Sequence, residues 1–245
     1  MPPGCSRACP APDQAWYNRP AREHLIRRRP TDSPFPPQAF QREDEGDDPL
    51  FYTHPRLVVH IDDQAIAAVG QVFRALIPPG SVVLDLMSSW RTHWPLGHPR
   101  KRLVGLGLND VEMRENPDLD EYLVHDVNRG PDLPFDANTF DAVVVTVSVQ
   151  YMTRPVETFQ QVNRILKPGG QLIITFSNRM FPTKAVRIWR QSSDQAHIEL
   201  VAAYMDFAGN YEDIRGGLVN PETSPPGDPL FLVVGKKSGP TPLAG

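Results

Sequence analysis

Cysteine is nearly absent from this chain of 245 residues, which contains only Cys5 and Cys9. Structural zinc sites normally take four ligands, so two cysteines with no further ligands beside them do not predict a metal centre. A long apolar run is also lacking, because the best one, Ala142 to Val149, has only the length of a strand. A helix that spans a membrane requires about 20 apolar residues, so we expect no membrane span.

An excess of positive charge is missing as well. The formal net charge is −4 at pH 7, so the chain has no general attraction for the phosphates of nucleic acids. Hydrophobic residues make up 40% and charged residues 22% of the chain, which is ordinary for a globular protein. We therefore expect one domain with its own core and no nucleic-acid or membrane partner.

Proline is what the chain has in abundance, with 27 residues that cluster toward both ends. This composition predicts a Pro-rich segment at 1–48, disordered or draped over the domain, a globular domain at 49–237 and a loose tail at 238–245. The acidic run from Glu43 to Asp48 is typical of a solvated linker. No apolar stretch like the core of a secretory signal occurs, so we expect a cytoplasmic protein, while the arginines of the first segment leave organellar targeting open.

Helix and strand patterns alternate along the globular part. A helix begins near Asp62 or Asp63 and is stopped by Pro78-Pro79-Gly80, and an irregular or helical piece is expected at 88–96. Further helices are expected at 109–115, 156–166, 184–190 and 194–207, and strands at 82–86, 103–108, 122–125, 140–148, 171–176, 211–217 and 230–235. The alternation predicts a doubly wound α/β fold with a mostly parallel sheet and helices on both faces.

A parallel sheet binds its ligand beyond the carboxyl ends of the strands, at the point where the strand order reverses. The first four expected strands end in polar or small residues, namely Asp85 to Ser89, Gly107 to Asp110, His125-Asp126, and Ser148 to Tyr151. Because these ends meet at one edge of the sheet, the sequence predicts a ligand site there.

Two longer stretches make a family resemblance specific. After VLDL at 83–86 come, in order and at suitable spacing, the stretches DLPFDANTFDAVVV at 132–145 and VNRILKPGGQLIIT at 162–175. In this arrangement, residues 65–237 resemble class I S-adenosylmethionine-dependent methyltransferases of the small-molecule "type 11" sort. The resemblance implies a seven-stranded sheet with an antiparallel last strand, S-adenosylmethionine as cofactor and methyl transfer to an unidentified small molecule.

The first turn departs from the pattern of that family, in which acid-x-Gly-x-Gly-x-Gly follows the first strand. Asp85 matches the acid, but Met87, Ser89 and Arg91 stand in the glycine places. Glycine there lets the backbone approach the cofactor and take strained dihedral angles. Ser88 and Ser89 are small, so their hydroxyls or amides could still meet a carboxylate near a helix start. The chain is similar in this turn to an uncharacterised subgroup that carries the same degenerate glycine motif.

The second and third strand ends complete the cofactor site that the resemblance implies. For the ribose hydroxyls the chain offers Gly107, Asn109 or Asp110, and we choose Asn109 because its amide both donates and accepts. Asp126 with Val127 matches the adenine contact of the family. The predicted cofactor-binding residues are thus Asp85, Met87, Ser88, Ser89, Asn109, Asp126, Val127 and Ser148.

His60 and Tyr151 are the predicted catalytic residues, since both lie near the expected mouth of the site. Positioning supplies much of the rate of methyl transfer, and a general base is needed only if the acceptor must lose a proton. The alternative is a non-catalytic binding or scaffold protein of the same fold that has lost affinity for the cofactor, and the missing glycines favour it.

Overall fold

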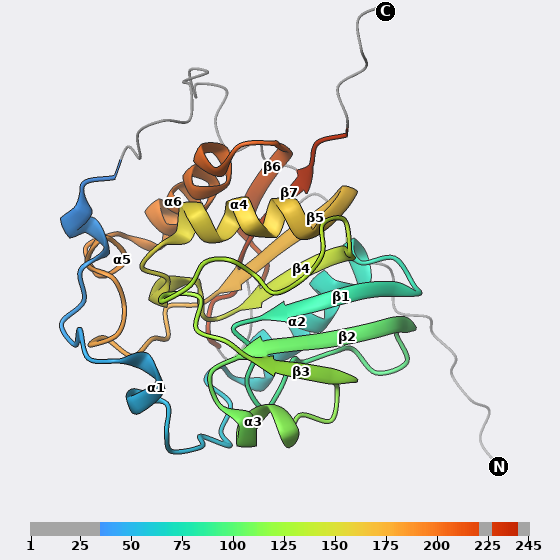
Figure 1. Cartoon of the computed structure of the whole chain (residues 1–245), viewed down its shortest axis with the longest axis horizontal. Coiled ribbons are helices and arrows are strands. Elements are labelled where there is room, and N and C mark those ends of the chain that lie inside the picture. The colour runs from blue at the N-terminus through green and yellow to red at the C-terminus, as the bar shows by residue number, and fades with distance from the viewer. Residues whose placement is uncertain (1–34, 221–226, 240–245) are drawn as a thin grey trace, which may run out of the picture.

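The computed structural model describes residues 35–220 and 227–239 and contains one seven-stranded sheet of order β3-β2-β1-β4-β5-β7-β6 (Figure 1). The strands are β1 Ser81–Leu86, β2 Arg100–Gly107, β3 Glu121–Val124, β4 Phe140–Thr146, β5 Leu166–Phe176, β6 Tyr211–Leu218 and β7 Phe231–Lys237. Strands β1 to β5 pair in parallel, whereas β7 runs antiparallel to both β5 and β6. The predicted doubly wound fold and its antiparallel last strand are confirmed.

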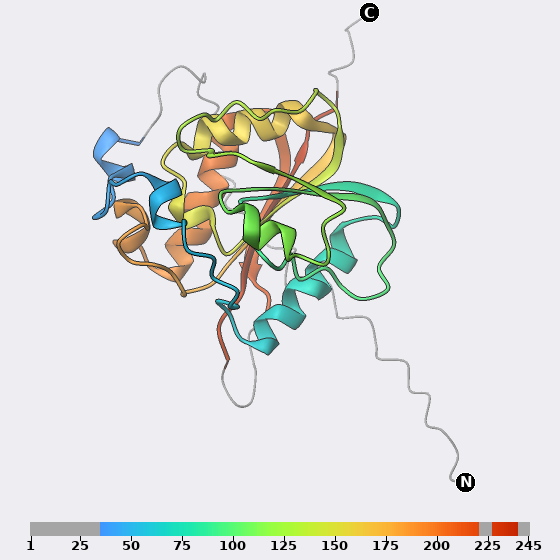
Figure 2. The same ribbon diagram turned by 60° about the horizontal axis from the view of Figure 1, so that its bottom comes forward.

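Helices cover both faces of this sheet, as the two views in Figures 1 and 2 show together. They are α1 Asp48–Phe51, α2 Asp63–Leu76, α3 Asp110–Arg114, α4 Pro155–Ile165, α5 Arg187–Arg190 and α6 Asp194–Ala208, with single 3-10 turns at Pro37–Phe40 and Val149–Tyr151. As expected from the sequence, α2 begins at a cap, because the Asp62 side chain accepts from the Ala65 amide. The helix expected at 184–190 is only one turn long.

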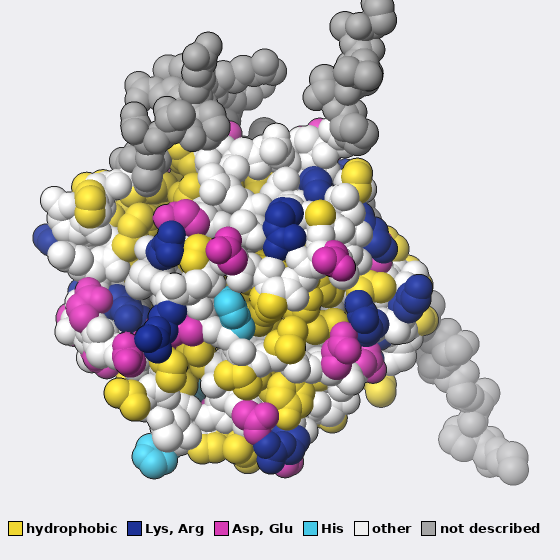
Figure 3. All heavy atoms as spheres, viewed as in Figure 1, with side chains coloured by type: hydrophobic (Ala, Val, Ile, Leu, Met, Phe, Trp, Pro, Cys, Tyr) yellow, Lys and Arg dark blue, Asp and Glu magenta, His cyan; other side chains and the backbone are white. Residues whose placement is uncertain are grey.

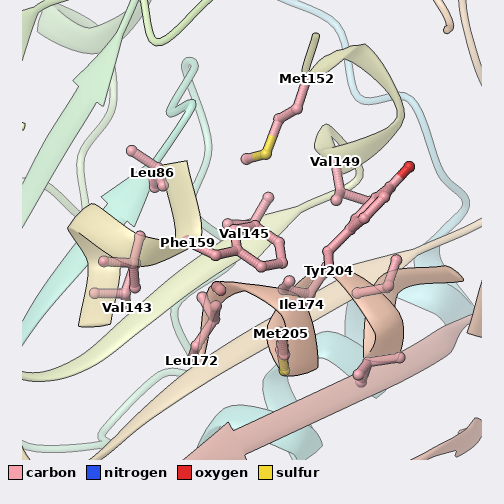
Figure 4. Close-up of a cluster of buried hydrophobic side chains, with 14 of the residues drawn as sticks. Leu86, Val143, Val145, Val149, Met152, Phe159, Leu172, Ile174, Tyr204 and Met205 are labelled. Carbon is pink, nitrogen blue, oxygen red and sulfur yellow. The ribbon is translucent and has the colours of Figure 1, made fainter. Parts of the chain in front are cut away.

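The core divides into two layers because neighbouring strand residues point to opposite faces. Val82, Leu84 and Leu86 pack with α4 and α6, whereas Val83 packs with α2. Figure 4 shows the first layer, where Phe159 of α4 and Tyr204 of α6 lie among side chains of β4 and β5. Burying such a side chain contributes about 1.5–3 kcal/mol, so this layer holds the strand ends of the sheet rigidly in place.

The crossover from β1 to β2, residues 87–99, contains no helix. Its first turn is instead fixed by backbone contacts with β2: the Ser88 amide donates to the Leu106 carbonyl at 2.8 Å. The Ser88 carbonyl lies directly against Gly107, where any Cβ atom would overlap it. Of the two alternatives for 88–96, the irregular piece is therefore the observed one, and no helix N-terminus stands behind Ser88 and Ser89.

Residues 35–48 pack onto the domain. The Phe35 ring lies edge-on to Phe40 and Tyr204, and Asp48 is only 5% exposed. The expectation of a solvated linker at 43–48 is therefore wrong for Asp48, which pairs with Arg42 at 2.6 Å and Lys184 at 3.2 Å. Residues 1–34, with both cysteines, and 240–245 lie outside the described residues. The domain bounds expected from the sequence stay a prediction.

The surface visible in Figure 3 carries basic and acidic side chains interspersed over the same face. Within the described residues, no helix has the length and apolar character required to cross a membrane.

The contact between the first turn and β2 can be tested with two glycines of the same strand. Gly107→Ala places a methyl group against the Ser88 backbone, which cannot move without breaking the turn, and should lower the free energy of unfolding by about 3 kcal/mol. Gly105→Ala is the control, because its methyl group meets the end of the Leu119 side chain, which can rotate away, and comes no nearer than 3.3 Å to the Ser88 hydroxyl and does not touch the Ser88 backbone. Urea unfolding followed by circular dichroism measures the free energy of unfolding of both variants. An equal decrease in the two variants would contradict the proposed contact.

Candidate functional site

A cavity lies at the carboxyl ends of β1, β2 and β4 and beside the loop after β3, where the arrowheads of β1 to β3 in Figure 1 point toward the segment with α1. All of the residues predicted to bind a cofactor or to act in catalysis line it, and so do additional residues from that segment. The topology thus brings together strand ends that are far apart in the sequence, as expected for the edge of a parallel sheet.

Asp85 organises the turn after β1. Its side chain is 3% exposed, and its Oδ2 accepts from the hydroxyls of Ser88 and Thr92, each at 2.7 Å. Burial raises the pKa of Asp85 to about 6, although both hydroxyl donors oppose the rise. The hydroxyl of Ser88 is thus used to hold the turn.

Met87 keeps the backbone conformation that glycine would supply at this position. Its φ is 61°, in the left-handed region that side chains rarely adopt, and its side chain packs against the hydrophobic core. Arg91 lies with its guanidinium 4.1 Å from the centre of the Trp90 ring. The path of the turn therefore does not require glycine, and its strain is balanced by the bonds to Asp85 and β2.

The second strand end differs most from the expectation. Asn109 lines the cavity, but its Oδ1 accepts from the Glu112 amide at 3.0 Å and its Nδ2 donates to the Tyr52 carbonyl at 2.6 Å. It caps α3 and fixes a distant backbone segment, and contact with a cofactor stays a prediction. Asp110, the other candidate, is exposed, pairs with Arg114 and does not line the cavity.

The third strand end leaves a carboxylate oxygen without a partner. Oδ1 of Asp126 accepts from the Asn128 amide at 2.9 Å, whereas Oδ2 is buried and has no hydrogen bond within the described residues. Val127 next to it is 4% exposed and gives the cavity an apolar wall. A buried acceptor without a donor is costly, so this oxygen is a candidate acceptor for a ligand's donor.

The end of β4 is strained and also holds unpartnered groups. Val147 has a φ of 52°, which is an outlier for a β-branched residue, and it lines the cavity. The hydroxyls of Thr146 and Ser148, on either side, are buried and make no hydrogen bond among the described residues. Such strain and unsatisfied groups concentrate at functional sites.

His60 and Tyr151 face the same cavity from different elements. Burial lowers the pKa of His60, whose ring lies 5.2 Å edge-on from Phe181. Burial raises the pKa of Tyr151, whose hydroxyl accepts from the Phe181 amide at 2.8 Å. At neutral pH, His60 is thus available as a proton acceptor and Tyr151 remains protonated.

Residues 42–61 form a strap along one side of the cavity, and its contacts there were not predicted, although draping of 1–48 over the domain was one of the alternatives. Asp48 accepts from Asn128 Nδ2 at 2.9 Å, which ties the strap to the loop after β3. Trp90 donates to the Val58 carbonyl at 2.8 Å, which ties it to the turn after β1. The acidic run and the short apolar stretches of this segment gave no signal for this packing, because its partners lie on remote elements.

Glu112 is the other residue that the sequence reasoning missed. It is 6% exposed and lines the cavity, and its carboxylate accepts from the Arg56 amide at 2.7 Å and the Ser89 hydroxyl at 2.6 Å. It therefore joins α3, the strap and the first turn. A glutamate in the first turn of a helix ordinarily faces solvent, so its position in the sequence did not distinguish it.

Comparison with known proteins finds similarity to methyltransferases over part of the chain. Residues 101–174 match the family described as a methyltransferase domain. A demethylmenaquinone methyltransferase of Renibacterium salmoninarum is 34% identical over 122 residues, 47% of each chain. One of Paenarthrobacter aurescens is 33% identical over 86 residues, 35% of this chain and 30% of that protein. The chain thus matches less than half the length of these relatives.

Solved structures agree on the fold. A methyltransferase of Thermotoga maritima, described as a possible histamine N-methyltransferase, has a TM-score of 0.53 at 16% identity, covering 71% of this chain and 89% of that one. A putative methyltransferase of Haloferax volcanii has a TM-score of 0.51 at 20% identity, and the match covers 74% of this chain and 90% of that one. The [4+2]-cyclase SpnF has a TM-score of 0.50 at 15% identity, and the match covers 71% of this chain and 82% of that one. The fold is the Rossmann-like methyltransferase fold.

Buried Asp85 makes stability depend on pH with a defined sign. Because its pKa is raised in the folded state to about 6, folding favours the neutral form, and the stabilisation present below about pH 4 is lost as the pH rises through 6. Asp85→Asn keeps the acceptor oxygen without the charge. Relative to this variant, wild type should lose about 1.4 kcal/mol per pH unit between pH 4 and 6.

Urea unfolding at four pH values measures this difference. Asp132→Asn, at an exposed position of the loop before β4, controls for the loss of one charge. A difference between wild type and Asp85→Asn that stays constant over this range would show that Asp85 is not held in its neutral form.

Proposed function

We propose that this protein is an S-adenosylmethionine-dependent methyltransferase that acts on a small molecule. The unpartnered Oδ2 of Asp126 carries the proposal, because the exocyclic amine of an adenine is the kind of donor that this buried oxygen lacks. The match of residues 101–174 to methyltransferase domains and the position of the cavity support it. When bound, S-adenosylmethionine supplies an electrophilic methyl group on its sulfonium.

The remaining groups of the cavity fit the same ligand. Val127 offers an apolar wall for an adenine ring, and the free hydroxyls of Thr146 and Ser148 can donate to or accept from polar groups of the cofactor. Met87 brings the backbone through the left-handed region that glycine would take in this turn. The degenerate glycine motif therefore does not by itself argue against a cofactor.

On the acceptor side, we assign His60 and Tyr151 to orientation of the methyl acceptor. In-line alignment of the acceptor with the methyl group supplies much of the rate. Where the acceptor must lose a proton, His60 can accept it because burial keeps its imidazole neutral at pH 7. Tyr151 stays protonated and can donate a hydrogen bond. The curated relatives are named for demethylmenaquinone, and we extend only the class, a small organic acceptor, to this chain.

The second candidate is a binding or scaffold protein of this fold without cofactor affinity. The first crossover without a helix favours it, because the filled glycine places at Met87, Ser89 and Arg91 then have no helix N-terminus beside them to bind a carboxylate. SpnF, a cyclase with a similar fold, supports the view that the fold serves other purposes.

Calorimetric titration with S-adenosylmethionine and S-adenosylhomocysteine separates the two candidates. We expect saturable binding of both in the micromolar range. Asp126→Asn keeps the bond from the Asn128 amide but puts a donor in place of Oδ2, and it should weaken binding by about 10- to 100-fold.

Asp132→Asn is again the matched control, since it lies outside the cavity, and it should leave the dissociation constant unchanged. An absence of heat up to millimolar ligand would favour the scaffold. An unchanged affinity in Asp126→Asn would show that the adenine does not lie against this carboxylate.

A further inference from the structure

The proposed function, on which the following inference rests, brings two vicinal ribose hydroxyls into the cavity. Each hydroxyl loses water when it is buried and must donate to an acceptor of the protein, since an unsatisfied buried donor is costly. A carboxylate suits such a pair best, because it has two acceptor oxygens and strengthens each bond with its charge.

The end of β2 cannot supply that carboxylate. Gly107 stands there, and the Ser88 carbonyl lies so close to it that no side chain can be placed at this position. The Ser88 amide holds this arrangement by its bond to the Leu106 carbonyl at 2.8 Å. The next polar residue, Asn109, already uses both ends of its amide on the Glu112 and Tyr52 backbone.

Four acidic residues line the cavity, and three have other assignments. Asp85 lies beneath the turn with its Oδ2 held by two hydroxyls, and Asp48 is paired with Arg42 and Lys184. Asp126 is the acceptor assigned to the adenine. Glu112 is the fourth, and it is 6% exposed without a cationic side chain paired to it among the described residues.

We propose that Glu112 is the ribose-binding carboxylate, supplied by α3 in place of the strand end. Its Oε2 now accepts from the Ser89 hydroxyl at 2.6 Å, a donor of the same chemical kind as a ribose hydroxyl. A ribose hydroxyl would take the place of the Ser89 hydroxyl at this oxygen. Oε1 accepts from the Arg56 amide at 2.7 Å, so the same carboxylate that binds the ribose holds the strap over the cavity.

A cycle of two ligands and two proteins tests this role. S-adenosylhomocysteine and its 2′,3′-dideoxy analogue are titrated calorimetrically into wild type and Glu112→Gln. The variant has the same size and keeps an oxygen for the Arg56 amide, so the fold should persist, which thermal unfolding checks. We expect wild type to bind the dideoxy analogue about 10- to 100-fold more weakly than the parent ligand, and Glu112→Gln to lose most of this discrimination.

Glu115→Gln is the matched control, because it removes the same charge from an exposed position that directly follows α3 and lies outside the cavity. It should discriminate as wild type does. Glu112→Asp keeps the charge but shortens the side chain by one methylene, and should also lose the discrimination.

Equal weakening of both ligands by Glu112→Gln would overturn the inference and leave Glu112 a structural clamp. The proposed function would survive that result, since the parent ligand still binds wild type. If wild type binds neither ligand, the proposed function fails first, and the role of Glu112 falls with it.

Discussion

The buried carboxylate of Asp85 is the constraint on which the site depends. By accepting from Ser88 and Thr92, it fixes a turn that no helix follows. The turn carries Met87 through a left-handed conformation and sets the Ser88 carbonyl on Gly107. Together with the bond from the Ser88 amide to the Leu106 carbonyl, this ionisable group holds the start of the first crossover in the place that closes the end of the second strand to side chains.

That closure explains why the polar groups of the site come from unusual places. With Gly107 covered and Asn109 used as a cap, the carboxylates that we propose for a ligand are Asp126 on the loop after β3 and Glu112 on α3. Glu112 also accepts a hydrogen bond from the Arg56 amide, so one carboxylate joins the strap to α3 at the cavity.

The residues that stabilise the fold and the residues that line the cavity lie in different parts of the molecule. The two apolar layers around the sheet are fully packed and hold the strand ends in position. At the cavity, by contrast, the structure retains a strained Val147 and unpartnered oxygens on Thr146, Ser148 and Asp126. These features lower stability by themselves and are consistent with a site arranged for a ligand's polar groups.

The sequence by itself determined the alternation of strands and helices, the cap at Asp62 and the strand ends that meet at the site, because apolar periodicity and turn residues act over a few neighbouring positions. Only the tertiary structure decided how the polar groups are used. Asn109 and Glu112 each bond to strap residues more than fifty positions away, and Asp48, in an acidic run typical of a solvated linker, is buried beside Lys184. Such pairings follow from the packing of distant segments, which no local pattern encodes.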